Sequence, residues 1–151
     1  MTSTANLQRR KLLAAGVALA VARPAFATRE EMVAAISAFT GGATPKAGRV
    51  TLEVAALVDN GNAVPISVAV ESPMTANDHV TAIAIFNERN PQTDVVKFAL
   101  GPRSGKALVS TRIRMATSQK LTAVARMSDG SFWTSSADVI VTLAACIEGE
   151  G

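Results

Sequence analysis

The sequence predicts an all-β fold, namely an immunoglobulin-like antiparallel β-sandwich with one short N-terminal helix and a mobile C-terminal arm. From Arg49 onward apolar residues recur at every second position, which is the period of a half-buried strand. Turn-forming residues interrupt this alternation about every 8–12 residues, as expected for about seven or eight short antiparallel strands. The length of 151 residues allows one domain and leaves no room for a second core of ordinary size.

Residues 1–27 are predicted to be a twin-arginine export signal. A basic run at residues 9–11 precedes an apolar stretch at residues 12–22, and Ala25-Phe26-Ala27 has the small-residue pattern of a cleavage site. The apolar stretch of about 11 residues is shorter than the roughly 20 that span a bilayer, which argues against a membrane anchor. The paired arginines favour the twin-arginine route. We therefore expect cleavage after Ala27, a periplasmic location and no association with the membrane.

One helix is expected at the start of the domain, which is predicted over residues 28–143. Thr28 and Glu31 have the spacing of a capping box, in which each side chain accepts a hydrogen bond from a first-turn amide. Apolar residues then recur at helical spacing up to Phe39, and Gly41-Gly42 ends the helix. This apolar stripe comprises Met32, Val33, Ile36 and Phe39, and it is available to the core or to a partner.

Strands follow the helix to the end of the domain. They are predicted at residues 50–58, 64–70, 80–86, 95–100, 106–115, 121–127, 132–135 and 139–143. Asn60-Gly61 predicts a turn, and Pro65 favours an edge position for its strand.

The strand at residues 80–86 is apolar on both faces. Residues 80, 82, 84 and 86 lie on one face, and Ile83 and Ile85 lie on the other. We interpret it as a central strand whose outer side is covered by the N-terminal helix. A subunit interface on that side is the compatible alternative, because exposed apolar patches mark binding surfaces.

The charge distribution argues against nucleic acid as a partner. The net charge is +3, but four of the 15 basic residues lie within residues 1–27, and the remaining 11 face 12 acidic ones. A polyanion-binding domain would keep a basic surplus. With one histidine and one cysteine, the chain also lacks the ligand set of a zinc site, and neither a metal nor a cofactor is predicted.

Several side chains are weighed as functional candidates. His79 follows Asp78 at the start of a strand, where a structural or solvated histidine is the favoured interpretation, and no nucleophile-elbow motif surrounds any serine. Arg112 and Arg114 share a strand face opposite Ile113 and Met115, which predicts a solvated outer face or docking to an acidic partner. Phe132 and Trp133 are interpreted as packing residues, with an interface role for Trp133 as the alternative.

Cys146 is the most informative residue, because it lies beyond the last apolar alternation. Residues 144–151 show no strand pattern and are expected to form the mobile arm. A lone thiol in an oxidising compartment pairs with another chain, stays reactive or is unused. The structural alternative is that Cys146 is a part-buried small apolar residue that closes the last strand.

The chain resembles the SoxY family, the sulfur-substrate carriers of the periplasmic thiosulfate-oxidising (Sox) system. The near-terminal cysteine after a final strand carries part of the resemblance. The other matching stretches are residues 59–65 (Asp-Asn-Gly-Asn-Ala-Val-Pro), 78–80 (Asp-His-Val), 85–91 (Ile-Phe-Asn-Glu-Arg-Asn-Pro), 111–116 (Thr-Arg-Ile-Arg-Met-Ala), 123–125 (Ala-Val-Ala) and 128–130 (Ser-Asp-Gly). Together they extend over essentially the whole domain.

The resemblance implies a non-enzymatic carrier with an immunoglobulin-like fold. Sulfur intermediates would be attached covalently to Cys146, with no catalytic residue in this chain. A SoxZ-like subunit would form a heterodimer with it. A SoxXA-like cytochrome would conjugate thiosulfate to the thiol, a SoxB-like hydrolase would release sulfate, and a SoxCD-like dehydrogenase would oxidise the remaining sulfane sulfur.

The arm departs from the family pattern, which flanks the cysteine with glycines. Here Ala144-Ala145 precede Cys146, and five residues with two glutamates follow it. The favoured interpretation is a carrier whose partners have wider channels, and a paralogue with another thiol substrate or a subtype that has lost loading are the alternatives. Two other functions stay open. One is a structural β-sandwich subunit cross-linked by an intermolecular disulfide, and the other is an enzyme with Cys146 as nucleophile and His79 as base.

Overall fold

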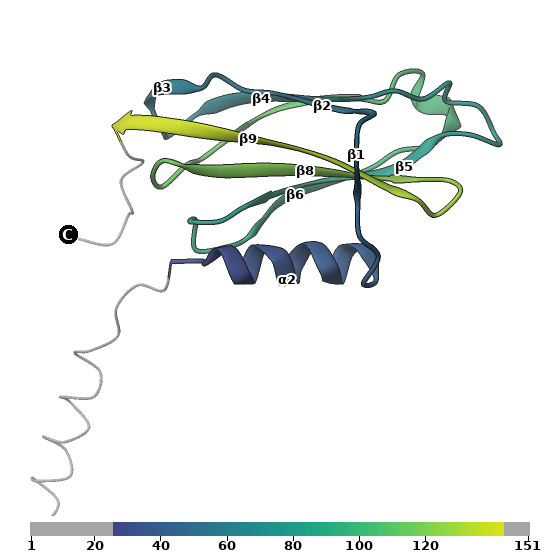
Figure 1. Cartoon of the computed structure of the whole chain (residues 1–151). Helices are drawn as coiled ribbons and strands as arrows, with labels where there is room; N and C mark the ends of the chain where they lie inside the picture. The colour runs from purple at the N-terminus through teal and green to yellow at the C-terminus, as the bar shows by residue number, and fades with distance from the viewer. Residues whose placement is uncertain (1–25, 144–151) are drawn as a thin grey trace, which may run out of the picture.

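Two β-sheets pack face to face, and one helix lies along the outer side of the larger sheet (Figure 1). The computed structural model describes residues 26–143. The predicted arm at 144–151 and residues 1–25 of the predicted export signal therefore lie outside the described residues. No helix in the described part is long and apolar enough to cross a membrane.

The larger sheet has six strands and the smaller sheet has three. In the larger sheet the order is β1-β9-β8-β5-β6, and β3 also pairs with β9; the smaller sheet has the order β2-β4-β7. The strands are β1 (Lys46–Ala47), β2 (Val50–Glu53), β3 (Leu57–Asn60), β4 (Val64–Val70), β5 (Val80–Asn87), β6 (Asp94–Ala99), β7 (Leu108–Ile113), β8 (Gln119–Met127) and β9 (Phe132–Leu143). A short 3₁₀ helix, η1 (Pro102–Ser104), joins β6 to β7. The predicted sandwich is confirmed, with β1 and the continuity of β9 as additions.

The helix α2 (Arg29–Thr40) begins as the capping box predicts. The Glu31 amide donates to Thr28 Oγ1 at 3.2 Å, and the Thr28 amide donates to Glu31 Oε2 at 2.7 Å. Gly41 ends the helix in the left-handed conformation, with φ 64°, which favours glycine. The predicted apolar stripe needs one correction: Val33 is 57% exposed, and Ala35 takes part in the packing instead.

The helix covers the outer side of β5 and β8. Met32 is buried against Ala84, Phe86 and Val124, and the Phe39 ring meets that of Phe86 edge to face at 6.0 Å between centroids. The prediction of a central strand covered by the helix is therefore confirmed. Val80 departs from the predicted face because the register shifts between Val80 and Ala82, so Val80 joins Ile83 and Ile85 in the core between the sheets.

The first predicted strand is split between the two sheets. β2 pairs with β4 in the smaller sheet, the chain then crosses over, and β3 pairs with β9 in the larger one. Most strand pairs are antiparallel, but β3 and β1 run parallel to β9, at its end and its start respectively. β3 arrives from the other sheet and β1 follows the helix, so neither strand is joined to β9 by a hairpin, the connection that would make the pair antiparallel.

Strand β9 runs unbroken where two strands are predicted. Its middle is polar, which hides the strand period, but the two polar side chains inside the predicted break, Ser136 and Asp138, both have partners across the ladder. Ser136 Oγ lies 2.9 Å from Thr122 Oγ1, and Asp138 forms an ion pair with Lys120 at 2.9 Å. These cross-strand pairs continue the ladder through the predicted break.

Pro65 lies on a central strand, so the prediction of an edge strand is wrong. β4 is flanked by β2 and β7, but β2 pairs only as far as Ser67. The Val70 amide donates toward β7 and the Glu71 amide toward β2, so by alternation the Pro65 nitrogen faces the β2 side. Pro65 therefore occupies a local edge, where its missing N–H removes no ladder hydrogen bond.

Candidate functional site

The site predicted by the sequence begins where β9 ends. Leu143 is the last described residue, and Cys146 follows three positions later, outside the described residues. The structure therefore gives the geometry of the surface from which the cysteine-bearing segment starts. The assignment of Cys146 itself stays a prediction.

The end of β9 is held on both sides. On one side β3 pairs with Ile140, Val141 and Leu143, and the Gly61 amide donates to the Leu143 carbonyl at 2.9 Å. On the other side the ladder with β8 ends at Val139, and Ser118 takes over: its Oγ accepts from the Val141 amide at 2.9 Å. The last strand is thus fixed up to its final residue.

Family motifs that are distant in the sequence meet at this end of the sandwich. Gly61, from residues 59–65, accepts at its carbonyl from the Met115 amide at 2.8 Å, which brings in residues 111–116. Asn90, from residues 85–91, donates through Nδ2 to the Arg114 carbonyl at 2.7 Å and accepts from the Ala116 amide at 2.9 Å. Three of the six stretches that carry the resemblance are therefore joined beside the start of the cysteine-bearing segment. Sequence periodicity gives no signal for Gly61 or Ser118 in this role.

His79 lies at the opposite end of the sandwich. Its amide donates to Ser128 Oγ at 3.1 Å, and its Nδ1 lies 3.0 Å from the Thr75 carbonyl, an acceptor that fixes the proton on Nδ1. Ser128 precedes the turn into β9, whose 12 residues extend for about 36 Å to Leu143. Because three residues reach only about 11 Å, Cys146 cannot meet His79 of the same chain. The pairing that the enzyme alternative requires is contradicted, and His79 has the predicted structural role.

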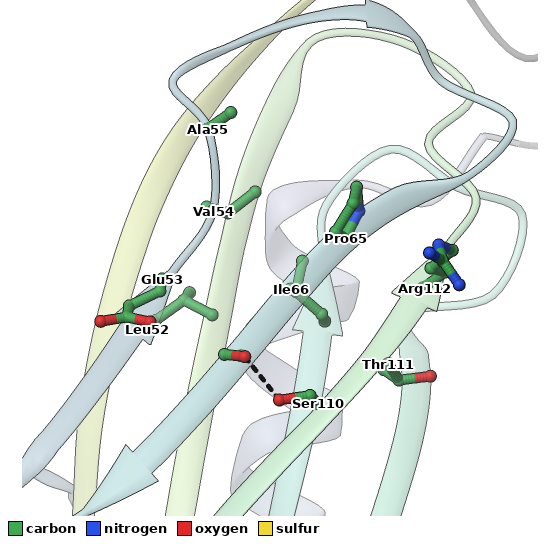
Figure 2. Close-up of a pocket in the computed structure, with 10 residues that line it drawn as sticks. Leu52, Glu53, Val54, Ala55, Pro65, Ile66, Ser110, Thr111 and Arg112 are labelled. Atoms are coloured by element: carbon green, nitrogen blue, oxygen red, sulfur yellow. Dashed lines mark hydrogen bonds between the residues drawn. The ribbon is translucent and has the colours of Figure 1, made fainter.

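The two arginines are exposed, while Ile113 and Met115 on the opposite face are buried, as predicted. Arg112 borders a groove of about 1010 Å³ that forms where β2 leaves β4 (Figure 2). Glu53 lies on the other side of the groove, and Ser67 Oγ lies 2.6 Å from Ser110 Oγ between them. The residues that line this groove include no histidine or cysteine, and they offer only hydroxyls and one charge of each sign.

Phe132 and Trp133 pack within the chain, as predicted. Phe132 meets Phe39 edge to face at 5.9 Å between ring centroids. Two cations lie over the Trp133 ring, with Arg49 Cζ at 5.1 Å and Lys46 Nζ at 5.8 Å from the ring centroid. These contacts attach the segment between α2 and β2 to the start of β9.

Titratable groups provide little further chemistry in the described part. Hydrogen bonds from the Ser131 hydroxyl and amide, together with the charge of Arg49, hold the pKa of the Asp129 carboxyl below its usual value. Residues 26–143 contain no group of three or more histidine, cysteine, aspartate or glutamate side chains that could hold a metal ion.

The architecture defines an immunoglobulin-like β-sandwich whose last strand is fixed immediately ahead of the single cysteine. The family model described as sulfur oxidation protein SoxY matches residues 36–146, so the match ends at Cys146. This chain belongs to the SoxY family of sulfur carriers, and the resemblance seen in the sequence is confirmed.

Solved structures agree with this assignment. The sulfur carrier protein SoxY from Chlorobium limicola f thiosulfatophilum is 28% identical, with a TM-score of 0.60, over 72% of this chain and 89% of that one. A superoxide reductase (neelaredoxin) from Ignicoccus hospitalis is 15% identical with a TM-score of 0.56, over 76% of this chain and 94% of that one. A superoxide reductase from Nanoarchaeum equitans is 12% identical with a TM-score of 0.54, over 64% and 100%. The two reductases share the fold alone. A search of curated proteins finds no match.

Proposed function

We propose that this protein is a periplasmic carrier that binds thiosulfate-derived sulfur covalently on Cys146 and presents it to partner enzymes. The observation that carries the proposal is the family match, which extends to Cys146, the one cysteine in the chain. The hydrogen bonds that fix the end of β9 support the proposal, because the cysteine-bearing segment then starts at the same position for every partner enzyme.

The chemistry divides into loading and release. In loading, the Cys146 thiolate and the terminal sulfur of thiosulfate form an S–S bond, and two electrons pass to a SoxXA-like c-type cytochrome. The product is a cysteine S-thiosulfonate. In release, a SoxB-like hydrolase adds water across the terminal S–S bond, which gives hydrogen sulfate and leaves a cysteine persulfide. A SoxCD-like dehydrogenase would oxidise the remaining sulfane sulfur.

In this proposal the chain itself is not an enzyme. It supplies the thiol and a surface, and a SoxZ-like subunit completes a heterodimer. The distance between His79 and the end of β9 supports a non-catalytic role, because the one histidine cannot act as a base for Cys146 in the same chain.

The test is the intact mass of the protein isolated from thiosulfate-grown cells, measured before and after reduction. We expect reducible additions of sulfur and sulfonate units on the wild type and none on Cys146→Ser, and we expect thiosulfate oxidation to stop in cells whose only copy is Cys146→Ser. An unmodified thiol during turnover would overturn the proposal. A permanent disulfide dimer that turnover does not change would instead establish the structural-subunit alternative.

A further inference from the structure

We propose that the fold closes the bond between Ala27 and Thr28 to proteolysis, so that removal of the export signal requires the first turn of α2 to open. The inference rests on the proposed periplasmic location and adds to it the structural step that controls processing. The reaction is a hydrolysis, in which water is added across the amide. It leaves a carboxylate on Ala27 and an amino group on Thr28.

Ala27 is held against the domain, although it is the last residue of the predicted signal. Its exposed fraction is 8%, whereas that of the preceding Phe26 is 47%. The Ala27 amide donates to the Asn90 carbonyl at 3.2 Å. A signal peptidase recognises the small side chain just before the bond that it cleaves. Ala27 must therefore leave its place on the domain before the peptidase can bind it.

Thr28, on the other side of the bond, is the N-cap of α2. Its amide donates to Glu31 Oε2 at 2.7 Å, and its hydroxyl accepts from the Glu31 amide at 3.2 Å. Its carbonyl accepts from the Met32 amide at 3.0 Å. Both residues of the bond are thus held by hydrogen bonds within the domain, and a protease that binds its substrate as an extended chain must first break them.

The first turn of α2 is a place where local opening is easier than global unfolding. Chain and element ends open with free energies well below that of the whole domain. Ala27 and Met32 are the two buried residues between Phe26 and Val33, and Met32 packs beneath the helix at 4% exposure. When opening is fast relative to cleavage, the cleavage rate follows the population of the open turn. Weakening the attachment of this turn should therefore speed processing while the sandwich stays folded.

The predicted export route gives this closure a role in maturation. Twin-arginine transport delivers folded proteins, so the peptidase meets a domain on which α2 is already docked. The helix begins at Arg29, directly after Thr28, so the fold extends to the bond itself. In the product, the Thr28 nitrogen is an amino group in the place of the amide and still donates to Glu31. The capping box is kept, and the contact between Ala27 and Asn90 is lost.

The first turn offers two matched pairs of substitutions. Met32→Ala removes the buried anchor, whereas Val33→Ala shortens a side chain that is 57% exposed. Glu31→Ala removes the carboxylate of the capping box, whereas Glu30→Ala removes a first-turn carboxylate that is not part of it. All four positions lie beyond the small-residue motif that a signal peptidase recognises.

The experiment measures cleavage of the folded full-length precursor by a purified signal peptidase in detergent. Intact mass gives both the rate and the bond that is cleaved. A peptide of residues 18–34 contains the same bond without the sandwich and gives the rate for the open site. Thermal unfolding of each precursor shows whether the sandwich remains folded.

We expect the precursor to be cleaved after Ala27 about tenfold or more slowly than the peptide. Met32→Ala should raise the precursor's rate about tenfold and Glu31→Ala about threefold, because each lowers the free energy of opening. Val33→Ala and Glu30→Ala should leave the rate unchanged. Glu31→Ala provides the test by itself where the melting temperature shows that Met32→Ala unfolds the whole domain.

Equal rates for precursor and peptide overturn the closed site and leave the proposed export and carrier functions standing. Equal changes within both matched pairs, or cleavage of the folded precursor at a different bond, overturn it as well. If the peptide is not cleaved after Ala27, the predicted signal fails and this inference fails with it.

Discussion

Ser118 and Gly61 hold the end of β9 through hydrogen bonds to Val141 and Leu143 respectively. The ladder with β8 ends at Val139, and the Ser118 hydroxyl replaces the missing strand partner for Val141. Gly61 does the same for the Leu143 carbonyl from the other side. Both contacts depend on one polar group at the right place, which no pattern of apolar residues can predict.

Replacing Ser118 by alanine removes the acceptor for the part-buried Val141 amide. We expect the free energy of unfolding to fall by about 1–3 kcal/mol, the cost of leaving such a group without a partner. The control is Ser110→Ala, whose hydroxyl bonds only at the exposed surface, with an expected change within about 0.5 kcal/mol. Urea denaturation of both variants checks this, and equal losses would contradict the role of Ser118.

The Asp129 carboxyl predicts a pH dependence. Its folded-state pKa is lowered, first of all by the Ser131 hydroxyl, so the unfolded chain takes up the proton first as the pH falls. The stability from this group is present above the unfolded-state pKa and is lost as the pH falls through the folded-state value. In Ser131→Ala the pKa of Asp129 should rise toward its usual value, which a carboxyl NMR titration measures. An unchanged pKa would show that the hydroxyl is not the cause.

At the scale of elements, the helix is well predicted from sequence and the short strands are not. The capping box and Gly41-Gly42 mark both ends of α2 within one residue. The two-sided apolar pattern at residues 80–86 likewise identified the strand beneath it. In contrast, β1 and β3 have two and four residues, too few to show a period, and their parallel partners are far away in the sequence.

The attachment of the helix gives a prediction with an internal control. Phe39→Ala should lower the free energy of unfolding by roughly 2–4 kcal/mol, because the ring contacts both Phe86 and Phe132 edge to face. Val33→Ala, on the exposed side of the same helix, should change it by less than about 0.5 kcal/mol. Thermal unfolding of the two variants measures the difference. A loss at Val33 as large as that at Phe39 would contradict the observed orientation of α2.

At the scale of the whole molecule, the sequence predicts the sandwich but not which end carries which residues. Asp78-His79 and Ser128-Asp129 meet at one end, whereas residues 59–65, 85–91 and 111–116 meet at the other, beside the end of β9. This division separates His79 from the cysteine-bearing segment. The exposed side chains of Leu57 and Ile140 had one signal in the sequence, which is the unbroken apolar run Val139-Ile140-Val141. Prediction from alternation assigns this run to one buried face and therefore misses the exposure of Ile140.

The continuous pairing of β9 also has a mechanical consequence. A load applied at the C-terminus along the strand axis acts on hydrogen bonds that lie across that axis, so the ladders with β8 and β3 bear it in shear. In single-molecule stretching, attachment at Ala76, at the far end, should therefore give a higher rupture force than attachment at Asn62, which separates β3 from β9 bond by bond. Equal forces would contradict this geometry. A partner that pulls on the terminal segment would then stretch that segment, while the sandwich resists unfolding.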